Sequence, residues 1–85
     1  MAGSKLLAQG IDRRRAILKF VKAYTKEYGF SPTVMEVAEG VGVGRTAARY
    51  HINLLIDEKY MAMTEGKYRS LRVVNDGRYP APASK

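Results

Sequence analysis

One short stretch of the sequence combines helical periodicity with side chains that suit hydrogen bonding to DNA. Residues 44–60 read GRTAARYHINLLIDEKY. In this stretch Ala48, Ile52 and Leu55 recur at a helical spacing and form one apolar stripe. The opposite face carries two hydroxyl groups, a guanidinium and an amide, on Thr46, Arg49, Tyr50 and Asn53. Because such groups bond to or stack on base edges and phosphates, we predict that this face binds DNA.

A second short helix is predicted just before this stretch. Residues 33–36 read TVME, which fits a capping box in which the hydroxyl of Thr33 and the carboxylate of Glu36 bond to first-turn amides. A turn containing Gly42 and Gly44 follows, so the two helices form a helix-turn-helix whose second helix, 44–58, enters the major groove. The hydroxyls of Ser31 and Thr33 lie beside the free amides of the first of these helices. They either only cap it or also hold a DNA phosphate.

A longer amphipathic helix is predicted from Asp12, its N-cap, to Gly29, which ends it. Its apolar positions recur with a period of 3.6 residues and comprise Ala16, Ile17, Phe20, Val21 and Tyr24. Three consecutive arginines, 13–15, lie near its start and either remain in solvent or contact phosphate. Residues 1–10 have little pattern and are predicted to form a flexible N-terminal arm.

The region after the helix at 44–58, the predicted recognition helix, is expected to form a β-hairpin. Two short runs, 60–64 and 68–74, flank a glycine-bearing turn at 65–67. The turn and its edge are basic and aromatic, with Lys67, Tyr68, Arg69 and Arg72. We predict a wing that contacts the flanking DNA backbone or minor groove; the alternative is a hairpin that only closes the core. Residues 75–85 lack periodicity and are predicted to be a disordered tail.

The fold class is therefore mainly α with a small β-hairpin: a winged helix-turn-helix of three helices and a two-stranded wing, spanning residues 11–74. Composition agrees, since 15 lysines and arginines against 8 aspartates and glutamates give a net charge of +7 over 85 residues, which favours an anionic partner. Without cysteine, and with His51 as the single histidine, the sequence offers no metal or cofactor site and no catalytic arrangement. It carries neither a signal peptide nor a membrane span, so we expect a soluble, cytoplasmic protein that is not an enzyme.

Two motifs resemble known families. The stretches YGFSPT at 28–33 and EVAE at 36–39 resemble the LexA repressor DNA-binding domain, whereas RTAARYHI at 45–52 is similar to the third helix of many winged-helix regulators, including MarR-like ones. The resemblance covers about residues 11–74. It implies base reading by Arg45, Thr46, Arg49, Tyr50 and Asn53, and backbone contacts from Ser31, Thr33, Lys67 and Arg69.

The sequence also departs from the LexA pattern. Gly44 stands where a serine or threonine often caps the recognition helix, and Lys59 stands where a glycine usually ends it. The turn into that helix is one residue shorter than in LexA. The protease and dimerisation domain of LexA has no counterpart in these residues, so the resemblance implies neither cleavage-based induction nor the LexA dimer.

These features predict a sequence-specific double-stranded DNA-binding protein, most simply a small transcriptional repressor of phage, prophage or bacterial type. A single domain makes few base contacts, so we expect it to bind as a homodimer on two half-sites or with a protein partner. Leu54 and Ile56 either contact a second subunit or pack inside the domain. Two alternatives remain: an excisionase-like or architectural recombination accessory protein, and a winged helix that serves as a protein–protein adaptor or anti-repressor.

Overall fold

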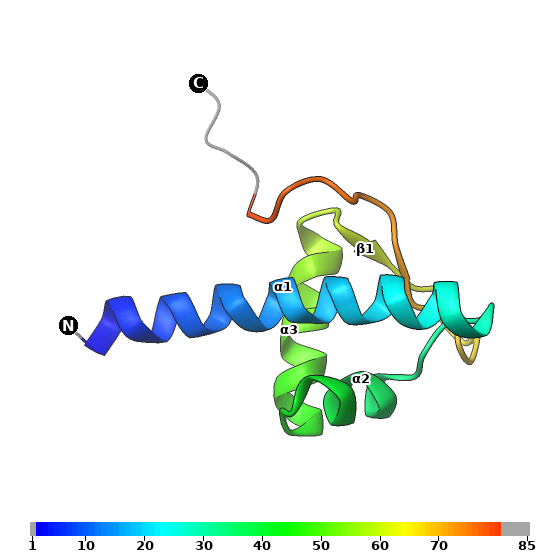
Figure 1. The fold of residues 1–85 in the computed structure, drawn as a ribbon, viewed down its shortest axis with the longest axis horizontal. Coiled ribbons are helices and arrows are strands. Elements are labelled where there is room, and N and C mark those ends of the chain that lie inside the picture. The colour runs from blue at the N-terminus through cyan, green and yellow to red at the C-terminus, as the bar shows by residue number, and fades with distance from the viewer. Residues whose placement is uncertain (1, 81–85) are drawn as a thin grey trace.

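The computed structural model describes residues 2–80, with side chains described from residue 10 onward. Three helices, α1 (Ala2–Tyr28), α2 (Val34–Val41) and α3 (Arg45–Asp57), precede two short strands, β1 (Met61–Ala62) and β2 (Arg72–Val73). The strands pair antiparallel, with Met61 opposite Val73. In Figure 1, α1 crosses in front of α3, with β1 above α1 and α2 below it. The predicted winged helix-turn-helix fold is confirmed.

All five elements contribute to one hydrophobic core. Ile17 and Val21 of α1, Val37 of α2, and Ile52 and Leu55 of α3 are at most 1% exposed. The hairpin adds two further buried side chains, those of Met61 and Leu71. The apolar stripe predicted for α3 is therefore the face that packs inward, and its polar face is left outside.

The first helix begins earlier than the sequence suggests. It is helical from Ala2, so the backbone shows no boundary at the predicted arm, and Asp12 lies in the helix interior instead of capping it. The Asp12 carboxylate instead lies 3.7 Å from Arg15, one turn along the helix. Ala16 is exposed, whereas Leu18 is buried, so the apolar stripe is rotated slightly from the predicted one. The helix ends as expected at Gly29, which has a φ of 81°.

The helix-turn-helix is fixed by local interactions. The predicted capping box is present: the Glu36 amide donates to the Thr33 hydroxyl at 3.1 Å, and the Thr33 amide donates to the Glu36 carboxylate at 2.9 Å. Gly42 ends α2 in the left-handed region with a φ of 84°. Gly40 allows close packing, because a β-carbon there would overlap the ring of Phe20 on α1. Gly44 begins α3 without a side-chain cap.

Lys59 ends α3 at the position where the LexA pattern has a glycine. It adopts the positive φ, 71°, that a glycine would take there. The Lys59 amide donates to the Ile56 carbonyl and the Tyr60 amide to the Leu55 carbonyl. This pair of bonds is a Schellman motif, and the buried side chains of Tyr60 and Leu55 complete it. A lysine thus takes a conformation that glycine adopts more easily.

The segment after β2 is docked on the domain, which corrects the predicted disordered tail for residues 75–80. Tyr79 is only 6% exposed and packs edge-on against Tyr60, with ring centroids 4.8 Å apart. Its hydroxyl accepts from Arg14 Nε at 2.6 Å and donates to Glu58 at 2.8 Å. The Tyr79 carbonyl accepts from Arg15 Nε at 2.6 Å. The remainder of the predicted tail, residues 81–85, lies outside the described residues.

Candidate nucleic-acid interface

The side chains predicted to read bases lie together on the outer face of α3. A shallow concavity of about 540 Å³ is lined by Val34 and by all five predicted residues, Arg45, Thr46, Arg49, Tyr50 and Asn53. All five are exposed, and Tyr50 retains 60% of its accessible surface. We call this set the recognition face. It presents two guanidinium groups, two hydroxyls and one amide from less than three turns of a single helix.

The inward face of α3 holds this helix in position. Ala48, Ile52 and Leu55 are buried in the core. His51 is buried beside them, and its Nδ1 lies 3.0 Å from the Arg14 guanidinium, which is a donor only. Burial, and then the positive charges of Arg14 and Arg13, lower the pKa of His51 below its usual value. The imidazole therefore stays neutral at neutral pH and accepts at Nδ1, so His51 connects α3 to α1 and does not bind phosphate as a cation.

A second groove, of about 640 Å³, extends the recognition face to the hairpin. It lies between the start of α2, the recognition helix and the loop at residues 63–71, and it shares Arg45 and Arg49 with the first concavity. Lys67 and Tyr68 line its far side, and Tyr68 is 77% exposed. A cation and an aromatic hydroxyl thus project from the wing loop on the same side of the molecule as the recognition face.

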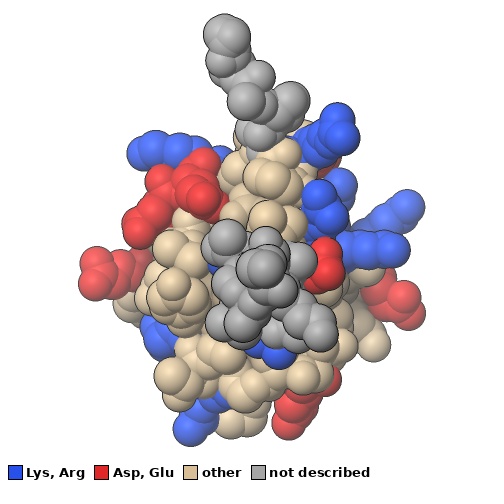
Figure 2. Space-filling view, turned by 90° about the vertical axis from the view of Figure 1, so that its left-hand side faces the viewer, with Lys and Arg blue, Asp and Glu red and all other residues tan. Residues whose placement is uncertain are grey.

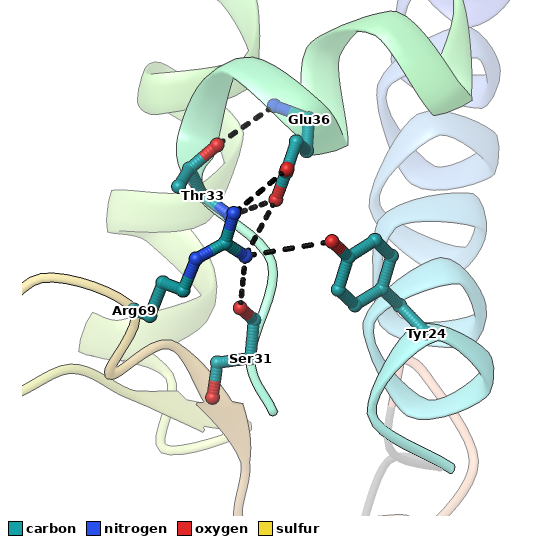
Figure 3. A network of polar contacts seen from close by, with 5 residues as sticks. All are labelled: Tyr24, Ser31, Thr33, Glu36 and Arg69. Carbon is teal, nitrogen blue, oxygen red and sulfur yellow. Dashed lines mark hydrogen bonds and ion pairs between the residues drawn. The ribbon is translucent and has the colours of Figure 1, made fainter. Parts of the chain in front are cut away.

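Arg69 has a different role from the predicted one. Its guanidinium donates to both Glu36 carboxylate oxygens at 2.9 and 3.0 Å and to the Ser31 carbonyl at 2.9 Å, and its Nη1 lies 3.4 Å from the Tyr24 hydroxyl (Figure 3). It also lies over the Phe30 ring, 4.8 Å from the centroid. Because Nη1 and Nη2 both bond to partners inside the protein, Arg69 connects the wing to α2, and we leave it out of the proposed DNA contacts.

This connection has electrostatic and conformational consequences. The Arg69 hydrogen bonds, followed by the amide of Thr33, lower the pKa of Glu36 to about 2. Arg69 also has a φ of 58°, in the left-handed region that non-glycine residues rarely adopt. The ion pair therefore holds a bend in the wing loop that the backbone would otherwise disfavour. The sequence pattern does not indicate this ion pair, because Arg69 and Glu36 lie 33 residues apart.

The other residues predicted to contact the DNA backbone already use part of their hydrogen-bonding capacity inside the domain. The Thr33 hydroxyl and amide are both engaged in the capping box, and the Ser31 carbonyl accepts from Arg69. Arg72 is exposed, and its guanidinium donates to the Ser70 carbonyl at 3.2 Å. The buried hydroxyl of Ser70, which sequence reasoning missed, bonds to the backbone of Thr64 and Lys67 and so shapes the wing loop.

The charge distribution is uneven over the molecule. In the view along α1, several basic side chains gather at the upper right with acidic ones beside and below them, and both kinds also lie on the left (Figure 2). Within the described residues, no group of three metal-ligating side chains comes together. No helix in that part of the chain is long and apolar enough to cross a membrane.

Comparison with known proteins decides the family. The family model described as the LexA DNA binding domain matches residues 9–70. The chain belongs to the LexA DNA-binding domain family. The family model thus covers the whole helix-turn-helix and the wing loop up to Ser70, and it ends before β2 and the docked segment. The helix-turn-helix motif identified from the sequence is the central part of a non-catalytic DNA-binding fold.

Relatives within this family include LexA repressors of several bacteria. The chain is 32% identical over 65 residues to the LexA repressor of Bifidobacterium adolescentis, covering 75% of this chain and 25% of the relative. It is 27% identical over 63 residues to that of Leptospira interrogans, covering 74% and 31%. It is 29% identical over 66 residues to that of Clostridium botulinum, covering 76% and 33%. The chain thus spans a third or less of the length of these relatives.

Proposed function

We propose that this protein is a sequence-specific repressor that binds double-stranded DNA with α3 in the major groove. The observation that carries the proposal is the recognition face: five side chains that suit base edges and phosphates lie exposed on one side of α3, and the opposite side is buried in the core. The domain family and the relatives named as repressors support the same function.

The proposed contacts follow from the chemistry of each side chain. Arg45 and Arg49 suit the two acceptors of guanine, and Asn53 suits the donor and acceptor of adenine, each such pair discriminating by about 1–3 kcal/mol. Thr46 and Tyr50 supply hydroxyls for phosphates or base edges. On the flank, Lys67, Tyr68 and Arg72 are proposed to contact the backbone or minor groove, with Ser31 and Thr33 near a phosphate at the start of α2.

We further propose that two copies bind together. Few base contacts from one helix give a single copy limited selectivity, whereas two copies on half-sites about one helical turn apart double the number of contacts. Ile56 packs against the core and is therefore not available to a second subunit. Leu54 is half-buried on α3 and remains the apolar candidate for that contact. Small repressors of phages, prophages or bacteria fit this description.

The experiment is a selection of random duplex DNA by the purified protein, followed by salt titration of the enriched pool. We expect an enriched, palindromic motif and a steep loss of affinity with salt. Arg49→Ala is expected to lose the preference for that motif over random DNA while its circular dichroism spectrum is unchanged. Arg13→Ala removes the same charge from an exposed position on α1 and is expected to retain the preference. Enrichment of the same motif by Arg49→Ala would contradict the assignment of this residue, and no motif at all would contradict sequence-specific binding.

A further inference from the structure

A third, basic groove shares no lining residue with the recognition face or with the groove between α2, α3 and the wing loop. It has a volume of about 620 Å³ and lies between α1 and the docked segment at residues 75–79. Its lining combines apolar groups of Leu18, Ala23 and Val73 with cationic side chains of α1. None of the functions proposed for α3 uses this groove.

The cations of the groove form a regular row. Arg15, Lys19, Lys22 and Lys26 recur at spacings of four, three and four residues, so they lie on one face of α1. At a helical rise of 1.5 Å per residue the row is about 16 Å long. Like charges at these spacings repel one another. An anionic ligand along the row therefore relieves repulsion that the free protein retains.

The row is only partly neutralised by the protein itself. Asp76 lies 3.7 Å from Lys22 and Asp12 lies 3.7 Å from Arg15, both at the surface. Across the described residues, no carboxylate lies within ion-pair distance of Lys19 or Lys26. The Asp76 contact is an example, within the protein, of a carboxylate beside α1 that pairs with one cation of the row.

We propose that this groove binds an acidic segment of a partner protein that also carries an apolar side chain. Five extended residues span about 16 Å, which matches the row of cations. The carboxylates of such a segment pair with Lys19 and Lys26, and its apolar side chain covers Ala23 and Val73, the groove-lining apolar residues that are not buried. DNA fits less well because a phosphate backbone has no apolar group for these residues, and a single small carboxylate reaches only part of the row.

The test is an NMR titration of the ¹⁵N-labelled protein with a capped peptide of sequence EDLEEFDE. We expect saturable shifts of the amides of residues 15–26 and 73–79, and little change at α3. The peptides EDSEESDE, without apolar side chains, and QNLQQFNQ, without charges, are expected to bind much more weakly. The double variant Lys19→Glu, Lys26→Glu is expected to weaken binding of EDLEEFDE about tenfold, since each exposed ion pair contributes modestly.

A matched double variant distinguishes binding in the groove from non-specific electrostatic attraction between the basic protein and the acidic peptide. Arg13→Glu with Lys59→Glu makes the same change in net charge outside the groove and is expected to leave binding unchanged. Circular dichroism checks that each variant is folded; if the first double variant is not, Lys19→Gln replaces it. Absence of saturable shifts, equal binding of EDSEESDE, equal loss in both double variants, or the same groove shifts with duplex DNA would each overturn the proposal. None of these measurements depends on the proposed repressor function.

Discussion

Replacing Tyr79 by alanine tests the largest difference between the sequence prediction and the structure. Tyr79 is 6% exposed, and an aromatic ring removed from such a site costs about 3–5 kcal/mol of unfolding free energy. Its edge-on contact with Tyr60 accounts for about 0.5–1.5 kcal/mol of this. The substitution also leaves Arg14 and Glu58 without the hydroxyl that joins them. Because the segment lies at the edge of the domain and relaxes readily, we use the lower value, about 3 kcal/mol.

That loss is large for a domain of this size, whose total stability is expected near the low end of about 5–15 kcal/mol. At about 4–8 °C per kcal/mol, Tyr79→Ala should lower the Tm by roughly 12–24 °C. The assay is urea unfolding and thermal melting followed by circular dichroism at the helix signal. Tyr79→Phe, which keeps the ring and removes only the hydroxyl, is expected to lose about 1–2 kcal/mol.

Tyr68→Ala is the matched control, because it removes the same side chain from a position that is 77% exposed. It should change stability by no more than about 0.5 kcal/mol. If Tyr79→Ala behaved like this control, the segment at 75–80 would not be docked, and the disordered tail expected from sequence would be the correct description.

Three further predictions follow from single contacts. Lys59→Gly should raise the unfolding free energy by about 0.5–1 kcal/mol, because glycine adopts the positive φ of the α3 terminus without steric cost; a lower Tm would contradict the Schellman assignment. The folded pKa of Glu36 is depressed to about 2, so its contribution to stability is complete above its ordinary pKa of 4.5 and is lost as pH falls from there towards 2. Urea unfolding of Glu36→Gln across this range should show a flatter pH dependence than the wild type; parallel curves would refute the Arg69 pairing. Lys67→Ala should lower the log–log salt slope of DNA binding by about 1 with the selected motif unchanged, whereas an unchanged slope would place the wing off the DNA.

The elements that sequence predicted correctly are those fixed by neighbours along the chain. The capping box joins Thr33 to Glu36, three residues on, and glycine ends both α1 and α2 where its freedom at positive φ is needed. The stripe of Ala48, Ile52 and Leu55 is likewise a local pattern, and it correctly gave the buried face of α3. Knowing which face is buried also shows which side chains are exposed, so the recognition face followed from the same pattern.

The features that sequence missed depend on partners far away in the chain. The sequence pattern left the arginines at 13–15 either in solvent or in contact with phosphate, yet Arg14 and Arg15 bond to Tyr79, more than 60 residues later. Arg69 looked like a wing cation, yet its partner Glu36 is 33 residues away. An unpaired arginine and an internally bonded arginine have the same local sequence pattern. Only the packing of the helices decides between them.

The burial pattern of α3 separates the residues that stabilise the domain from those proposed to recognise DNA. His51, Ile52 and Leu55 face the core, whereas Arg49, Tyr50 and Asn53 make none of the side-chain hydrogen bonds found among the described residues. Substitutions on the outer face therefore leave the packing and the connections to α1 intact. Arg69 is the opposite case, because a basic residue of the wing loop is committed to holding that loop against α2. The proposed DNA contacts of the wing thus rest on Lys67, Tyr68 and Arg72, and Arg69 contributes by fixing the position from which they reach the duplex.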